Sequence, residues 1–334
     1  MKKTLSTTAL AVSLALCSFV ANAADFKPAV AYDSAGKFDK SFNQAVFQNG
    51  ATKFTEDTQI AVRDFVPSND AQREQGLARL ARGGYNPIVA VGFMYGSALE
   101  KIAKKYPDTQ FVIIDSVVDL PNVKSLLFKE HEGSFLVGAL AALKSENKKV
   151  GFVGGMDIPL IRKFACGYEQ GAKYINKDVE VFQNMTGSTN AAWSDPARGA
   201  ELTKSQFTKG VDVVFAAAGG TGVGVYQAAK DGGKYAIGVD SNQNHLHPGV
   251  MLTSMVKLVG VATYDIFKKA EAGSFSAGID TLGLKENGVD WALDENNRAL
   301  VTPEMETQIN NIKSKIVAGE IVVHDYTTDS SCNY

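Results

Sequence analysis

Short apolar runs alternate with helical patterns along this chain of 334 residues, and the alternation occurs as two successive series. The apolar runs of the first series lie at 28–32, 59–67, 86–93 and 109–117, and those of the second at 148–157, 179–187, 211–220, 234–241 and 250–258. Strands that are apolar throughout and alternate with helices predict a parallel sheet covered on both faces. Two series of about 120 residues each favour two doubly wound α/β lobes over one very large sheet.

The order of the segments predicts how the lobes share the chain. We expect the first lobe to comprise residues 24–146 plus about 257–300, because a helical pattern at 257–273 follows a strand suited to crossing back. The second lobe is then expected to comprise 147–256 plus about 301–334. The pattern is least clear over the last sixty residues.

The first 23 residues have the features of an export signal. Two lysines precede an apolar segment, and the small-x-small sequence Ala-Asn-Ala at 21–23 predicts cleavage after Ala23. A lipoprotein needs a cysteine preceded by a small residue after the apolar segment, but Leu16 precedes Cys17, so lipidation is the weaker interpretation. No later stretch reaches the roughly 18 apolar residues of a membrane span. We therefore expect a free periplasmic protein.

The charge balance argues against nucleic acid as a partner. Of 34 basic residues, two lie in the signal, which leaves 32 against 36 acidic residues and a net charge of −4. A chain without basic excess lacks the electrostatic attraction that dominates binding to nucleic acid and to anionic membranes.

Two cysteines remain after the expected cleavage, Cys166 and Cys332. In an oxidising exported compartment a bridge between them is plausible and would tie the tail to a helix of the second lobe. The alternative is two unpaired thiols.

Polar side chains follow several predicted strands. Asp33, Asp115 and Asp240 each end an apolar run, and the carboxyl ends of parallel strands are where ligands bind in open α/β sheets. Phe42 and Asn43 lie in the first helical turn after the first strand, behind candidate caps at 39 and 41, and should share that edge. The aspartates could instead cap the following helices. A carboxylate, an aromatic ring and an amide, from Asp33, Phe42 and Asn43, suit a flat ligand with hydroxyls and ring nitrogens.

Three further residues are candidates for the same site. Trp193 lies between a strand end and a helix start, where it either packs locally or meets the ligand; with Phe42 it could grip a planar ring. The run at 216–230 imitates a dinucleotide fingerprint but has the wrong spacing. We therefore expect Gly219 to let the backbone approach a ligand, and no cofactor. Lys257, beside the predicted crossover, could reach the cleft or lie on the surface.

Catalytic motifs are weak. The four histidines show no two-histidine metal spacing on a helix, no G-x-S-x-G elbow occurs, and no Asp-dense segment resembles a calcium-binding site. We expect neither an enzyme nor a metal site.

These segments resemble the basic membrane protein family of substrate-binding proteins, also called the purine nucleoside receptor A family. The matching pieces are DKSFNQ at 39–44, VIIDS at 112–116, WSDPARGAE at 193–201, FAAAGGTGVGV at 215–225, IGVDSNQ at 237–243, LTSMVK at 252–257 and IVAGEIVV at 316–323. They span nearly the whole mature chain in order. The resemblance implies a two-lobed type I periplasmic-binding fold that delivers nucleosides to an ABC permease, and we expect a monomer.

The resemblance also implies roles for the candidate residues. Phe42 and Trp193 would be the stacking plates, and Asn43, Asp33 and Asp115 the partners of the base. The ribose would then be held by Asp240, Lys257 and the region of Gly219. Tryptophan at 193 departs from the commoner phenylalanine, and the lipid anchor of many members is missing. Two alternatives remain: a receptor for a sugar or another small heterocycle, and an exported nucleoside hydrolase that uses the aspartates.

Overall fold

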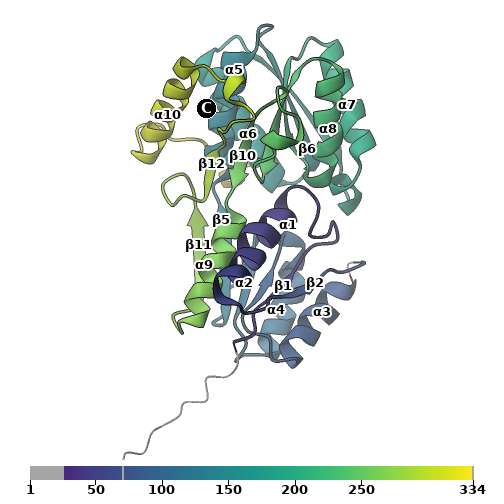
Figure 1. Ribbon diagram of the computed structural model, residues 1–334, viewed down its shortest axis with the longest axis vertical. Helices are drawn as coiled ribbons and strands as arrows, with labels where there is room; N and C mark the ends of the chain where they lie inside the picture. Colours follow the sequence, from purple (N-terminus) through teal and green to yellow (C-terminus); the bar gives the residue numbers. More distant parts are fainter. Residues whose placement is uncertain (1–25, 70, 333–334) are drawn as a thin grey trace, which may run out of the picture.

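The computed structural model describes residues 26–69 and 71–332 and divides them into two α/β lobes, one above the other in Figure 1. The expected signal peptide and its cleavage site lie outside the described residues. Each lobe is built on a six-stranded sheet with helices on both faces. Two doubly wound lobes are the fold class that the alternating pattern predicted.

The first lobe contains a wholly parallel sheet in the order β2-β1-β3-β4-β5-β11. Its strands are β1 (Ala29–Ala31), β2 (Arg63–Phe65), β3 (Ile88–Ala90), β4 (Phe111–Ile114), β5 (Val123–Phe128) and β11 (Gly278–Leu282). Its helices are α1 (Phe42–Ala45), α2 (Lys53–Thr58), α3 (Ala71–Arg82), α4 (Gly96–Lys105) and α9 (Val259–Glu271). A wider helical segment, Val46–Thr52, joins α1 to α2.

The second lobe has the same strand order, β7-β6-β8-β9-β10-β12, and only β12 runs antiparallel to its neighbour. Its strands are β6 (Lys149–Met156), β7 (Glu180–Gly187), β8 (Val213–Ala217), β9 (Tyr235–Asp240), β10 (Met251–Lys257) and β12 (Val289–Trp291). Its helices are α5 (Glu130–Lys144), α6 (Pro159–Ile175), α7 (Pro196–Thr208), α8 (Gly222–Asp231) and α10 (Pro303–Val317).

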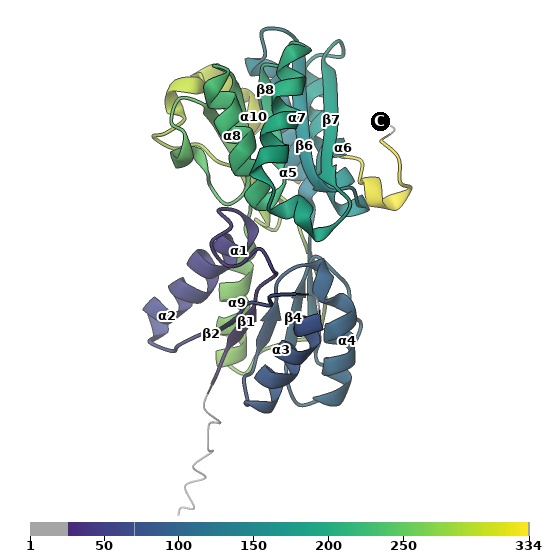
Figure 2. The ribbon, with the colours of Figure 1, turned by 90° about the vertical axis from the view of Figure 1, so that its right-hand side faces the viewer.

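Burial follows the position of a strand in its sheet. All residues of β1, β3 and β4 are buried because helices cover both faces of the sheet centre. Figure 2 shows these helices on either side of the strands. The run at 59–67 instead yields only the short edge strand β2, in which Arg63 is exposed, because β2 pairs with β1 alone.

The chain passes between the lobes after β5, after β10 and after β11, and these crossings correct the expected lobe boundaries. The sequence assigned α5 to the first lobe, but α5 packs against α6 of the second lobe (Figure 1). The packing is close: a Cβ atom at Gly138 would come within 2.0 Å of the Tyr168 carbonyl oxygen. The segment 289–291 likewise forms β12 of the second sheet rather than part of the first lobe. The error arose because β5, which ends the first series, was not recognised.

Candidate functional site

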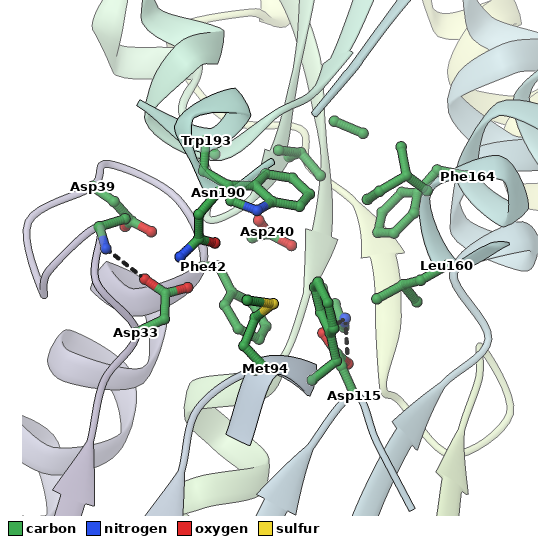
Figure 3. A pocket seen from close by; sticks show the side chains of 18 residues that line it. Asp33, Asp39, Phe42, Met94, Asp115, Leu160, Phe164, Asn190, Trp193 and Asp240 are labelled. Atoms are coloured by element: carbon green, nitrogen blue, oxygen red, sulfur yellow. Dashed lines mark hydrogen bonds and ion pairs between the residues drawn. The ribbon is translucent and has the colours of Figure 1, made fainter. Parts of the chain in front are cut away.

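A cavity lies between the lobes, at the carboxyl ends of the strands of both sheets (Figure 3). The space between atoms in this cavity, including the part that opens to solvent, is about 690 Å³. Its lining comes from loops or helix starts that follow β1, β3, β4, β6, β7 and β8, and from the last residues of β8, β9 and β10. The lining residues are Asp33, Ala35, Asp39, Phe42, Gly92, Phe93, Met94, Asp115, Leu160, Ile161, Phe164, Asn190, Trp193, Ala217, Gly219, Val239, Asp240 and Lys257.

The two candidate stacking residues line the cavity from opposite lobes. Phe42 is the first residue of α1, and Trp193 ends a short 3₁₀ turn, Asn190–Trp193, after β7. Figure 3 shows Trp193 on the side of the second lobe and Phe42 on that of the first. Gly155 makes room for the indole, since a Cβ atom there would lie 2.1 Å from the Trp193 ring. The arrangement places two aromatic side chains on the lining of one cavity, from opposite lobes.

The carboxylates of Asp33 and Asp39 are held by the start of α1. Asp39 caps the helix, because its side chain accepts the backbone N–H groups of Ser41, Asn43 and Gln44 at 2.9–3.0 Å. Asn43 lies behind them: its Nδ2 donates to Asp33 Oδ1 at 2.8 Å and to Asp39 Oδ2 at 3.1 Å.

Asn43 is fully buried and does not line the cavity. The structure therefore brings Asp33 to the ligand space and places Asn43 one layer behind it. Burial raises the pKa of Asp33 above its ordinary value, although the hydrogen bond from Asn43 opposes this effect. Burial likewise raises the pKa of Asp39.

Asp240 takes part in contacts that join the lobes. Its Oδ2 accepts a hydrogen bond from Ser41 Oγ of the first lobe at 2.6 Å. In the same place Ser241 Oγ donates to the Ser41 carbonyl at 2.8 Å, and Gln243 Nε2 donates to the Lys40 carbonyl at 2.6 Å. Burial raises the pKa of Asp240 to about 7, against the opposing effect of Lys257. The site thus contains a carboxyl group that titrates near neutral pH and contacts both lobes.

Lys257 and Asp115 form a buried ion pair on the cavity wall. Lys257 Nζ lies 2.6 and 2.7 Å from the two carboxylate oxygens of Asp115, and their side chains are 2% and 7% exposed. Lys257 Nζ also lies 5.1 Å from the centre of the Phe42 ring, within cation–π range. Burial lowers the pKa of Lys257, but Asp115, Glu130 and other carboxylates outweigh it and raise the pKa above its ordinary value. The ammonium group therefore stays charged.

Several lining residues were not predicted as site residues. Leu160 and Phe164 lie one turn apart at the start of α6 and line the cavity on the side of that helix (Figure 3). Met94, which follows β3, is a further apolar lining residue and lies beside Phe42 in Figure 3. The position of Leu160 and Phe164 after β6 agrees with the rule that ligands bind at the carboxyl ends of parallel strands, which we call the strand-end rule and which also identified the aspartates. Asn190 lines the cavity and donates across the lobes to Ser34 Oγ at 3.0 Å. Asp39 was considered only as a cap, and Gly219, which was predicted, lines the cavity beside Trp193.

The two cysteines belong to the second lobe and do not line the cavity. The structure joins Cys166 of α6 to Cys332 of the tail in a disulfide, with Cα atoms 5.5 Å apart. Within residues 26–69 and 71–332, no group of three histidine, cysteine, aspartate or glutamate side chains is arranged to hold a metal ion. In the same ranges no helix has the length and apolar character needed to span a bilayer.

The chain is similar to proteins of one known family. The family model of PnrA-like ABC transporter substrate-binding proteins matches residues 27–327. A Lactococcus lactis protein named "ABC transporter nucleoside-binding protein BmpA" is 32% identical over 329 residues, covering 90% of this chain and 89% of its own length. An uncharacterized lipoprotein of Pyrococcus horikoshii is 34% identical over 281 residues, covering 80% and 69%.

Solved structures confirm the fold. The crystal structure of an ABC transporter solute-binding protein from Aeropyrum pernix superimposes with a TM-score of 0.82 at 30% identity, covering 90% of this chain and 94% of that one. The match to the family model extends over both lobes and includes every residue that lines the cavity. The chain therefore belongs to the PnrA-like family of ABC transporter substrate-binding proteins.

Proposed function

We propose that this protein binds a nucleoside, with purine nucleosides as the first candidates, and delivers it to the permease of an ABC importer. The observation that carries the proposal is the pairing of Phe42 and Trp193 across one cavity that also contains Asp33, Asp240 and the Asp115–Lys257 pair. Planar bases stack on aromatic rings, and carboxylates accept hydrogen bonds from ring N–H groups and ribose hydroxyls. The name of the Lactococcus relative supports the same ligand class.

The charge of the cavity favours a nucleoside over a nucleotide. Four carboxyl groups line it, from Asp33, Asp39, Asp115 and Asp240, against one lysine among the lining residues. Lys257 is already paired with Asp115. A phosphate group would enter a space without a free positive charge among its lining residues and would be repelled by the remaining carboxylates.

Binding and lobe closure are expected to be coupled. The first lobe supplies Phe42 and Asp33, and the second supplies Trp193 and Asp240. A ligand that touches both sets favours the closed arrangement by its difference in affinity for the closed and open forms. We propose that the ligand is released unchanged, since the relatives are named as binding proteins.

The location and the assembly state are part of the same proposal. We propose an exported, periplasmic monomer whose signal peptide is cleaved after Ala23. The Pyrococcus relative is named a lipoprotein, so mass spectrometry of the mature protein tests this point directly. A mass that begins at Ala24 supports the free form, whereas a diacylated cysteine at position 17 contradicts it.

The ligand class is tested by isothermal titration calorimetry with adenosine, guanosine, inosine, cytidine, ribose and glucose. We expect binding heat with one or more nucleosides and none with the free sugars. Heat with a sugar alone would overturn the nucleoside assignment in favour of a sugar receptor. Incubation with inosine and chromatography of the products tests catalysis, and release of hypoxanthine would contradict a role in binding alone.

Fluorescence provides a local reading. The chain has two tryptophans, Trp193 and Trp291, and Trp291 is a buried residue of β12 outside the cavity. In a Trp291→Phe variant the emission comes from Trp193 alone. A stacked base should change that emission, and the dissociation constant obtained from the emission change should equal the one obtained by calorimetry.

A further inference from the structure

A line of four buried charges extends from the cavity wall into the second lobe. Lys257 Nζ contacts both oxygens of Asp115 and lies 2.8 Å from Glu130 Oε1. Lys163 Nζ lies 2.8 Å from the other oxygen, Glu130 Oε2. The side chains of Lys257 and Glu130 are 2% and 1% exposed, so their charges interact with little screening by water.

Glu130 occupies a special place in the chain. It is the first residue of α5, directly after the crossing from β5. Lys257 is the last residue of β10, directly before the crossing to α9. The Glu130–Lys257 pair therefore joins two of the segments that connect the lobes. Lys163 strengthens this junction, because its Nζ also donates to the Phe128 carbonyl at 3.0 Å.

Burial of two charges is costly unless each has well-placed partners. The ammonium group of Lys257 donates hydrogen bonds to both carboxylate oxygens of Asp115. Its second carboxylate partner is Glu130, whose Oε1 lies 2.8 Å from Lys257 Nζ in an ion pair. Burial raises the pKa of Glu130, but Lys257 and Lys163 outweigh it and hold the pKa at about 2. Glu130 is thus a carboxylate at neutral pH.

We propose that Glu130, which does not line the cavity, is a positioning residue for ligand binding: it fixes the ammonium group of Lys257, and through it the carboxylate of Asp115, at the cavity wall. This inference rests on the proposed function for its ligand. Loss of the Glu130 charge removes one of the two carboxylates that lie within 2.8 Å of Lys257 Nζ. Without this partner, the ammonium group of Lys257 and the carboxylate of Asp115 are no longer held in the one arrangement that contacts the ligand.

The first test needs no ligand. An amine is acylated only in its uncharged form, so the rate at which acetic anhydride modifies Lys257 reports how firmly the ammonium group is held. We expect mass spectrometry to show at least about tenfold faster acetylation of Lys257 in Glu130→Gln than in the wild type, which corresponds to a fall of about one unit in its pKa. The matched control is Glu132→Gln, which removes the same charge from the same helical turn. Glu132 pairs with Lys129 and not with Lys257.

The second test measures binding of the four nucleosides by calorimetry. Glu130→Gln should weaken the tightest of them about 10- to 100-fold, the effect of losing a charged hydrogen bond, and Glu132→Gln should stay within about threefold of the wild type. The double variant Glu130→Gln/Lys163→Met also removes the lysine that loses its close carboxylate partner in Glu130→Gln and keeps only the more distant Asp325. This double variant should fold even where the single variant does not. It should remain weak in binding and fast in acetylation of Lys257.

The outcomes separate the two proposals. Recovery of wild-type acetylation and affinity in the double variant would mean that Glu130 only neutralises Lys163, and would overturn the inference. Unchanged acetylation of Lys257 in Glu130→Gln would overturn it as well. Absence of nucleoside binding by the wild type would refute the proposed function, while the acetylation rates would still decide the role of Glu130.

Discussion

Removal of the Trp193 ring should weaken ligand binding more than any other single change at the aromatic residues of the cavity. In Trp193→Ala the ligand loses one stacking surface. A stacked aromatic contact contributes about 0.5–1.5 kcal/mol beyond burial, and about 60 Å² of ring surface no longer covered adds about 1.5 kcal/mol at 25 cal/mol per Å². The sum, about 2–3 kcal/mol, corresponds to an affinity about 30- to 150-fold lower. Isothermal titration calorimetry with the best nucleoside measures it.

Two controls separate stacking from damage to the lobe. Because the ring also packs over Gly155, the melting temperature of each ligand-free variant must be measured. Trp193→Phe keeps an aromatic surface and should lose less than about tenfold in affinity, while Phe42→Ala removes the opposite, smaller surface and should show a similar but lesser loss. Affinity of Trp193→Ala within about threefold of the wild type would refute the idea that this ring holds the ligand.

Four further predictions follow from the same geometry. Burial raises the pKa of Asp240 to about 7 in the folded protein, so the folded state binds the carboxyl proton more tightly than the unfolded state does. The free energy of unfolding should therefore fall as the pH rises from about 4 to 7. Denaturant unfolding should show a flatter pH dependence in Asp240→Asn than in the wild type, and identical pH profiles of the two proteins would contradict the raised pKa. Ser41→Ala removes the hydroxyl that reaches Asp240 across the lobes and should weaken nucleoside binding about fivefold, with a larger radius of gyration in solution scattering; an unchanged radius and affinity would argue against a role in closure. Replacement of Cys166 and Cys332 by serine opens a loop of 166 residues and should lower the free energy of unfolding by about 2–5 kcal/mol without changing ligand affinity, because the disulfide lies outside the cavity. Gly155→Ala forces a methyl group into the Trp193 ring and should shift Trp193 emission and weaken binding, whereas wild-type emission would show that the indole can move without cost.

The strand-end rule explains why part of the site could be predicted. Asp33, Asp115 and Asp240 each follow an apolar run, and parallel sheets place such residues at one edge regardless of the details of packing. The structure brings all three to one cavity. Trp193 was a candidate for a similar reason, although its pairing with Phe42 required the relative placement of two lobes.

Other parts of the site could not be read from local patterns. Asn43 lies in the expected helical turn, but only its hydrogen bonds to Asp33 and Asp39 show that it lies behind these carboxylates and not on the cavity wall. Glu130 lies after β5, a strand that the pattern did not reveal, and its two lysine partners are distant in sequence. The hydrophobic periodicity of a sequence does not show which charged residues, distant along the chain, pair in the folded structure.

The sequence by itself determined the class of fold, because the alternation of apolar strands and helices is a local property that each segment carries, and it determined which residues stand at strand ends. The tertiary structure decided where the chain changes lobe, because each element joins the lobe in which its apolar surface packs better. In the second lobe α5 packs against α6, and β12 pairs with β10. It also decided the charge state and orientation of the polar groups. Asp240 and Lys257 acquire unusual pKa values only when folding removes water from both and brings distant charges within a few ångströms.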